Sequence, residues 1–179
     1  MINKIIHTKE LELFISDTCE ENNICVNMDE SILKAHYTII KVDRYYNSLH
    51  LGHLRKTPPS VDCLIALKCR DNEFVIYLVE LKNIKSSKNF EIDNIYNKFK
   101  STIENFMGSR FKKIFHNERY KIKFLHLYFV TRPYGEDEKS RRKEGTTKLD
   151  SLVARKPFKF LGKRCQIKHK IPDPIIKRC

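Results

Sequence analysis

Two neighbouring apolar runs of the chain carry charged residues at the ends that would meet in a hairpin. Asp62 stands at the entrance of the first run, and Glu80 and Lys82 stand at the end of the second. Side chains two positions apart in a strand point to the same face, so Glu80 and Lys82 are expected to project together. In an antiparallel pair the start of one strand lies beside the end of the other. The spacing therefore predicts that Asp62 lies next to Glu80 and Lys82.

Two carboxylates held at close range repel each other and raise a pKa unless a cation lies between them. Oxygen ligands of this type suit Mg²⁺, and Mn²⁺ is expected to substitute for it. An ammonium group such as that of Lys82 can then offset the charge of an attacking hydroxide or a strained phosphate. The alternative is that Glu80 and Lys82 form an exposed ion pair at a strand end, worth under about 1 kcal/mol. Asp62 would then be an ordinary turn residue.

Four strands are predicted to build the framework around these residues. Residues 61–67 and 74–82 are compact apolar runs, and residues 68–73 between them include the Asp-Asn of a turn, so the pair is predicted to form a β-hairpin. Residues 37–46 are rich in β-branched and aromatic side chains and are also expected to be a strand. A further strand is predicted at 123–131.

The clearest helix is predicted at residues 91–107, where apolar residues recur at helical spacing and Gly108 follows as a stop. Helices are also expected at residues 8–21 and 29–36. Polar or Gly- and Pro-containing loops are expected at 47–60 and 83–88. Together these elements predict an α/β fold with a central mixed β-sheet flanked by helices.

The spacing of the acidic and basic residues resembles the PD-(D/E)xK nuclease superfamily, the restriction-endonuclease-like fold. The matching residues are Pro-Ser-Val-Asp at 59–62 and Glu-Leu-Lys at 80–82, followed by a helix and another strand. The resemblance covers residues 37–131 and implies a restriction-endonuclease-like core. It departs from the family pattern at one point, because two residues separate the proline from Asp62.

By this resemblance, Asp62 and Glu80 would hold the metal together with the backbone carbonyl of Leu81, and Lys82 would position or activate the attacking water. Members of the superfamily often carry another acid before the first core strand. Glu30 is the candidate for that acid, and Glu21 is the alternative. His36 also precedes the first core strand and could complete the site, since some viral cap-cleaving members carry an early histidine.

The chain is strongly basic, with 35 Lys and Arg against 22 Asp and Glu and a net charge of +13. Such a field concentrates polyanions, and nucleic acid is the commonest of them. One domain is expected over residues 1–179, with a core at 37–131 and a basic C-terminal elaboration at 132–179. The alternative is that the basic residues form only a solvated face. The predicted nucleic-acid-binding residues are Lys98, Arg141, Arg142, Lys143, Arg155, Lys156, Lys159, Lys163 and Arg164.

The six cysteines show no paired spacing typical of a zinc site, and the first residues do not form a secretory signal. Free thiols in a reducing cytoplasm are therefore expected. The longest apolar run, residues 74–79, is too short to cross a bilayer. Neither a Gly-rich phosphate loop nor a dinucleotide fingerprint is present in the sequence, so no nucleotide cofactor is expected.

The resemblance implies hydrolysis of phosphodiester bonds in double-stranded DNA by a metal-activated water. A small nuclease of this fold without an ATP motif is most similar to a type II restriction endonuclease, which acts as a homodimer. Three alternatives remain open. The chain could be a repair, recombination or structure-specific nuclease of the same fold, an RNA-cleaving endonuclease, or a non-catalytic nucleic-acid-binding subunit.

Overall fold

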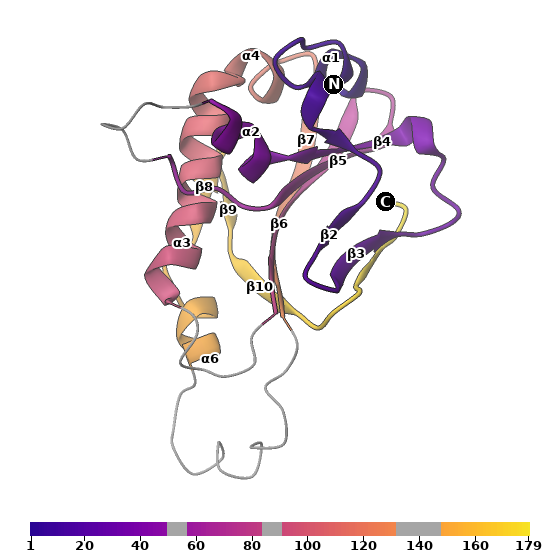
Figure 1. The fold of residues 1–179 in the computed structure, drawn as a ribbon. Helices are drawn as coiled ribbons and strands as arrows, with labels where there is room; N and C mark the ends of the chain where they lie inside the picture. Colours follow the sequence, from indigo (N-terminus) through magenta and orange to yellow (C-terminus); the bar gives the residue numbers. More distant parts are fainter. Residues whose placement is uncertain (50–56, 84–90, 132–147) are drawn as a thin grey trace.

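A six-stranded mixed sheet forms the centre of the protein (Figure 1). The computed structural model describes residues 1–49, 57–83, 91–131 and 148–179. The first four strands in sheet order are antiparallel to their neighbours, and the last three run parallel to one another. The strands in sheet order are β1 (Ile15–Ser16), β4 (Tyr37–Lys41), β5 (Cys63–Arg70), β6 (Glu73–Lys82), β7 (Lys121–Thr131) and β10 (Ile167–Lys170).

The predicted hairpin is confirmed as the pair β5–β6. Its turn contains Asn72 with φ of 57°, a left-handed conformation that asparagine adopts more readily than most residues. Both strands are apolar at nearly every position because both faces of the sheet are covered. Cys63 is opposite Val79. Continuing this register by one residue brings Asp62 level with Glu80.

One face of the sheet is covered by helices (Figure 1). Ile95, Phe99 and Phe106 of the long helical segment share a core with Leu78 and Leu127 of the sheet. The helix predicted at 91–107 is confirmed in position, but its second half winds as a π-helix through Gly108, which does not end it. The helical elements are α1 (Ile2–Ile6), α2 (Val42–Ser48), α3 (Ile92–Ser101), the π-helical η4 (Thr102–Arg110) and α4 (Lys112–Phe115).

The other face is partly covered by a small three-stranded sheet in the order β11-β3-β2. Buried Ile24 and Val26 of this sheet pack with Ile65, Tyr77 and Val79 of the central sheet in a second core. The molecule therefore has helices, a central sheet and a smaller sheet as successive layers. The strands of the small sheet are β2 (Cys19–Glu21), β3 (Ile24–Met28) and β11 (Ile175–Ile176).

Both predicted N-terminal helices are wrong. Residues 8–21 contain only the 3-10 turn η1 (Glu12–Phe14) before β1 and β2, and residues 29–36 contain only the 3-10 turn η2 (Lys34–His36). Asn22 and Asn23 both have positive φ and turn the chain back from β2 into β3. The apolar spacing of residues 8–21 suited a helix, but cross-strand pairing with β3 and β4 determines the structure.

The strand predicted at residues 37–46 is correct only as far as Lys41. Val42, Tyr45 and Tyr46 are buried at the helical spacing of α2, which begins directly after β4. The predicted loops at 47–60 and 83–88 lie partly outside the described residues. The strand predicted at 123–131 is confirmed and begins two residues earlier, in β7.

The C-terminal residues 148–179 take part in both sheets. β10 extends the central sheet beside β7, and β11 pairs with β3. The remaining elements are α6 (Lys148–Val153) and the hairpin β8 (Phe158–Phe160) to β9 (Lys163–Cys165), where Phe158 stacks on Tyr96 of α3. Across the described part of the chain, the helices are too short or too polar to span a membrane.

The expectation of six free thiols is wrong. Disulfides join Cys19 to Cys63 and Cys69 to Cys179, with Cα–Cα distances of 6.0 and 5.3 Å. Cys25 and Cys165 are free. The partners lie 44 and 110 residues apart along the chain, so no local spacing of cysteines indicated these pairs. The cytoplasmic location stays a prediction, and disulfides are usually associated with oxidising environments.

Candidate active site

Asp62 and Glu80 are buried carboxylates at one end of the central sheet. Glu80 lies in the apolar strand β6 and is 1% exposed, and Asp62 lies just before β5 and is 6% exposed. Alternation along β6 directs Glu80 toward the face that carries the helices. Buried carboxylates are rare unless they are paired or hold a metal. Their burial excludes the alternative in which these acids belong to an exposed strand end.

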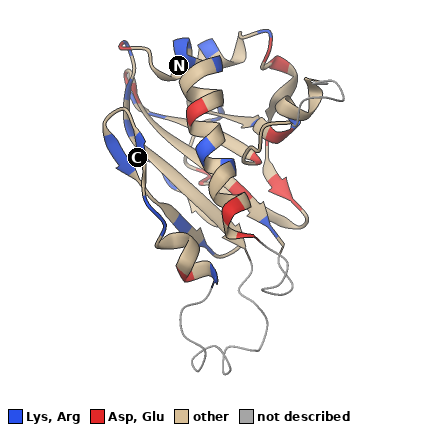
Figure 2. Cartoon of the chain, turned by 90° about the vertical axis from the view of Figure 1, so that its left-hand side faces the viewer, with Lys and Arg blue, Asp and Glu red and all other residues tan. Residues whose placement is uncertain are grey.

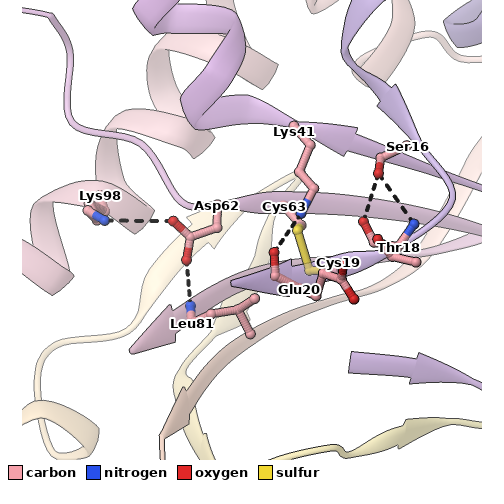
Figure 3. The surroundings of a disulfide bond; sticks show 9 residues. All are labelled: Ser16, Thr18, Cys19, Glu20, Lys41, Asp62, Cys63, Leu81 and Lys98. Atoms are coloured by element: carbon pink, nitrogen blue, oxygen red, sulfur yellow. Dashed lines mark hydrogen bonds and ion pairs between the residues drawn. A yellow bond between two sulfur atoms is a disulfide. The ribbon is translucent and has the colours of Figure 1, made fainter. Parts of the chain in front are cut away.

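A single ammonium group stands between the two carboxylates. Nζ of Lys98, which lies on α3, is 2.6 Å from Oε1 of Glu80 and 4.0 Å from Oδ1 of Asp62. Figure 3 shows the Lys98 side chain reaching from the helix toward Asp62. The side chain of Lys98 is only 24% exposed. Lys98 was predicted to be a surface contact for nucleic acid, and the structure instead makes it part of the carboxylate site.

Backbone groups fix the orientation of Asp62. The amide of Leu81 donates a hydrogen bond of 2.6 Å to Oδ2 of Asp62 (Figure 3). The amide of Val61 donates to Oγ1 of Thr102 at 3.2 Å, and the Thr102 hydroxyl donates to the carbonyl of Lys98 at 2.8 Å. Thr102 is fully buried. The residue before Asp62 is thus connected to the helical turn that carries Lys98.

The electrostatics of the pair favour retention of a proton or binding of a cation. Burial raises the pKa of Glu80 to about 7, although the nearby Lys98 acts to lower it. Burial, followed by the charge of Glu80, raises the pKa of Asp62 well above its ordinary value. Burial alone lowers the pKa of Lys98, but the Glu80 and Asp62 carboxylates raise it overall. Lys98 therefore stays charged and compensates one of the two carboxylates.

Of the two N-terminal acids considered for the site, Glu21 is the one whose charge acts on the pair. After burial and the charge of Glu80, Glu21 is the next acid that raises the pKa of Asp62, and it acts likewise on Glu80. Burial is the main cause of the raised pKa of Asp43, and the charge of Glu21 adds to it. Glu30 is exposed between β3 and η2 and is not among the principal charges acting on Asp62 or Glu80.

Lys82 and His36 take different places relative to the site. Lys82 ends β6 on the same alternation as Glu80, is half-buried, and its charge acts to lower the pKa of Glu80. The direct ion pair with Glu80, however, is made by Lys98. His36 lies at the opposite end of the sheet, because β4 and β5 are antiparallel and the start of β4 lies beside Leu67. The structure does not bring His36 to Asp62.

The predicted nucleic-acid-binding residues do not form one uniform surface. Arg155 is ion-paired with Asp93 and lies over the Tyr96 ring, and the Lys163 ammonium donates to the carbonyls of Ile122 and Lys123. Figure 2 shows acidic as well as basic residues along the helix that faces the viewer. The exposed members are Lys156, Lys159, Lys163 and Arg164. Arg141, Arg142 and Lys143 lie outside the described residues.

Two contributors to the site, Lys98 and Thr102, were not identified from the sequence in this role. They are four residues apart on the helical segment, next to buried Phe99, so both lie at the edge of its apolar stripe. A lysine at the edge of an apolar stripe would have been a usable signal. The amide of Val42, at the start of α2, also donates to the carbonyl of Asp62 at 3.0 Å.

The site has features that suit a divalent cation. Oε2 of Glu80 is buried and has no hydrogen-bond partner among the described residues. In that same part of the chain, no three Asp, Glu, His or Cys side chains converge closely enough to hold a metal ion. Asp62 and Glu80 would therefore supply two ligands, which is a common arrangement for Mg²⁺ completed by water and phosphate oxygens. The backbone carbonyl of Leu81 stays a predicted third ligand.

Comparison with models of known protein families gave no match for this chain, and comparisons with curated proteins and with solved structures gave none either. The fold and site define a mixed α/β protein with a buried carboxylate pair at one end of its central sheet.

Proposed function

We propose that the chain is a metal-dependent endonuclease that hydrolyses phosphodiester bonds in DNA, built on a restriction-endonuclease-like core. The observation that carries the proposal is the pair Asp62 and Glu80, two buried carboxylates that share one ammonium group at the end of a hairpin. A helix and a strand follow the hairpin, α3 and then β7 parallel to β6. That order is the one that the resemblance implies.

The residues of the chain have separate roles in this proposal. Asp62 and Glu80 would hold Mg²⁺, with Asp62 kept in orientation by the Leu81 amide. When bound, the metal polarises the phosphate and lowers the pKa of a bound water so that it can attack. Lys98 balances the negative charge of the carboxylates, and Lys82, at the less buried end of β6, is placed to contact the scissile phosphate or the attacking water.

The basic charge of +13 favours a polyanionic substrate, and double-stranded DNA is the proposed one. A small nuclease without nucleotide-binding motifs is consistent with a type II restriction endonuclease acting as a homodimer. A structure-specific or repair nuclease of the same fold is the second candidate. It is favoured by one observation, the exposed aromatic and basic row on the far face of the sheet described below.

The proposal is tested by incubating the protein with supercoiled plasmid and Mg²⁺. Discrete fragments are expected from a restriction enzyme, and a smear is expected from a nuclease without sequence preference. Asp62→Asn and Glu80→Gln should abolish cutting and leave plasmid binding intact. Asp71→Asn is the matched control, because Asp71 lies fully exposed at the turn end of the same hairpin. Cutting that survives both site substitutions would falsify the assignment.

A further inference from the structure

A row of aromatic side chains lies on the face of the sheet that is turned away from α3. Phe124, His126 and Tyr128 occupy alternate positions of β7 and so project from the same face. The Phe124 and His126 rings are stacked with centroids 5.8 Å apart, and the His126 and Tyr128 rings follow at 5.9 Å. Tyr77 of the neighbouring strand lies against both His126 and Tyr128, at 4.9 and 5.3 Å.

Part of this row is open to solvent. The small sheet packs on this face over β5 and β6, where Val75, Tyr77 and Val79 are buried. Beyond that cover, Phe124 is 57% exposed, and His126 and Tyr128 are half-buried. An aromatic row at alternate strand positions more often belongs to a core, but a core position does not leave a phenylalanine so exposed. Buried Tyr77 lies beside the row on β6 and contacts two of its rings.

The edge strand β10 places positive charge beside the aromatic rings. Lys168 is paired in register with Tyr128, and Nζ of Lys170 lies 5.1 Å from the centroid of the Tyr128 ring. Burial, and then the charges of Lys168 and Lys170, lower the pKa of His126, which keeps its ring uncharged near neutral pH. The acid on the same alternation of β6 is Glu73, and it is ion-paired with Lys121 and Lys123 at 3.1 and 3.2 Å.

We propose that the row formed by Phe124, His126 and Tyr128, with Lys168 and Lys170, binds the unpaired bases of a single-stranded nucleic acid. Flat apolar rings accept any base by stacking, and adjacent lysines pair with the phosphates without reading sequence. A duplex offers no base faces to such a row. The inference rests on the proposed nuclease function and favours its second candidate, a structure-specific nuclease whose substrate has an unpaired segment.

The row and the carboxylate site belong to the same strands. Tyr128 is paired with Val79, the residue before Glu80. The Tyr128 and Glu80 side chains project from opposite faces of the sheet. Tyr128 and the carboxylate site therefore lie on opposite faces of the sheet, near the same end of β6 and β7. This geometry suits a substrate in which a single strand adjoins the bond to be cut.

Binding is measured by fluorescence anisotropy with labelled oligothymidylate and with a duplex of the same length, in EDTA so that no cutting occurs. Phe124→Ala and Tyr128→Ala should each weaken binding to the single strand by about fivefold or more, and duplex binding should change little. Leu33→Ala is the matched control for an exposed apolar side chain elsewhere, at 65% exposure. Equal losses for single strand and duplex would overturn the inference.

A second experiment does not depend on affinity. The chain has no tryptophan, so Phe124→Trp creates a single fluorescent reporter in the row. Oligothymidylate should quench its emission, because a stacked base contacts the indole directly. Heparin, a polyanion without bases, should not quench it, and Leu33→Trp should respond to neither. Quenching by heparin as strong as that by oligothymidylate, or no quenching at all, would refute stacking.

These outcomes are separable from those of the nuclease proposal. Single-strand binding that depends on Phe124 in a protein that cuts nothing supports the row and rejects the nuclease. Cutting that requires Glu80, with single-strand binding unchanged by Phe124→Ala and Tyr128→Ala, supports the nuclease and rejects the row.

Discussion

Nζ of Lys98 lies 2.6 Å from Oε1 of Glu80, so a positive charge is already present where the proposed metal would bind. Asp62 lies 4.0 Å from the same nitrogen. Lys98 thus acts as an internal counterion that holds the two carboxylates together in the metal-free protein. A metal ion must share this negative charge with Lys98, which lowers its affinity for the site.

Replacing Lys98 with methionine should destabilise the metal-free protein and increase its response to Mg²⁺. Removing one member of a buried ion pair leaves the other charges uncompensated and typically costs about 3–5 kcal/mol. Urea unfolding in EDTA should show this loss, and added Mg²⁺ should recover a larger share of stability in Lys98→Met than in the wild type.

Lys82→Met is the comparison for this variant. Lys82 is also a half-buried lysine near Glu80, but the direct ion pair with Glu80 is made by Lys98. Its unfolding free energy should change by under about 1 kcal/mol. If Lys82→Met and Lys98→Met lose the same stability in EDTA, Lys98 is not the internal counterion.

Loss of the Glu80 proton should make the metal-free protein less stable as the pH rises. Burial raises the pKa of Glu80 from 4.5 to about 7, so the folded state holds this proton more tightly than the unfolded state does. The resulting stability is complete below the unfolded value and is lost as the pH rises through about 7, amounting to about 3 kcal/mol. Urea unfolding from about pH 5 to about pH 8 measures it.

Glu80→Gln should reduce this pH dependence and leave the part that comes from Asp62, whose pKa burial also raises. Asp71→Asn should keep the full dependence, since Asp71 is fully exposed. Stabilisation by Mg²⁺ should grow over the same interval, because a carboxylate must lose its proton before it binds metal. Equal pH slopes for the wild type and Glu80→Gln would show that Glu80 is ionised throughout.

Thr102 is expected to act as a positioning residue. Thr102→Val leaves the buried amide of Val61 without its acceptor, which costs about 1–3 kcal/mol. Because Val61 precedes Asp62, the variant should also need more Mg²⁺ for half-maximal cutting. Thr102→Ser keeps the hydroxyl and should keep the metal requirement while losing about 1 kcal/mol for the missing methyl group. A purely structural role would leave the metal requirement unchanged in both variants.

The disulfides can be counted directly. Thiol titration of the unfolded, unreduced protein should detect two thiols, those of Cys25 and Cys165. A titre of six would contradict both disulfides and favour the thiols expected from the sequence.

The two disulfides should differ in their effect on activity. Removing either pair by serine substitution should cost up to about 4 kcal/mol, because both close long loops. Only loss of the Cys19–Cys63 pair should raise the Mg²⁺ requirement for cutting, since Cys63 follows Asp62 and Cys19 begins the strand that ends at Glu21. Equal Mg²⁺ requirements for the two double variants would refute this role.

The hairpin and its acids were predictable because their signals are local. The apolar runs of β5 and β6 flank a short turn, so the pairing that brings Asp62 level with Glu80 follows from chain order. The helix at α3 was predictable from its periodicity for the same reason. The parallel addition of β10 was not predictable, because β10 is a short and mostly polar strand that lies far along the chain from its partner β7.

The remaining parts of the site depend on contacts between distant residues. Lys98 was assigned to the surface because it is charged, but its ammonium group forms an ion pair with the buried Glu80. Glu21 lies in a segment whose helical spacing of apolar residues is overridden by pairing between β2 and β3. The disulfide partners of Cys63 and Cys69 could only be found once the layers were assembled.

Both disulfides are anchored in β5, one at its first residue, Cys63, and the other near its last, at Cys69. Their partners are Cys19 in the small sheet and Cys179 just after β11. While these bonds are intact, the small sheet cannot separate from the central sheet. The two sheets should therefore unfold in a single cooperative transition. In the reduced protein the small sheet is free to open first, so hydrogen exchange in β2 and β3 should become faster than in β6.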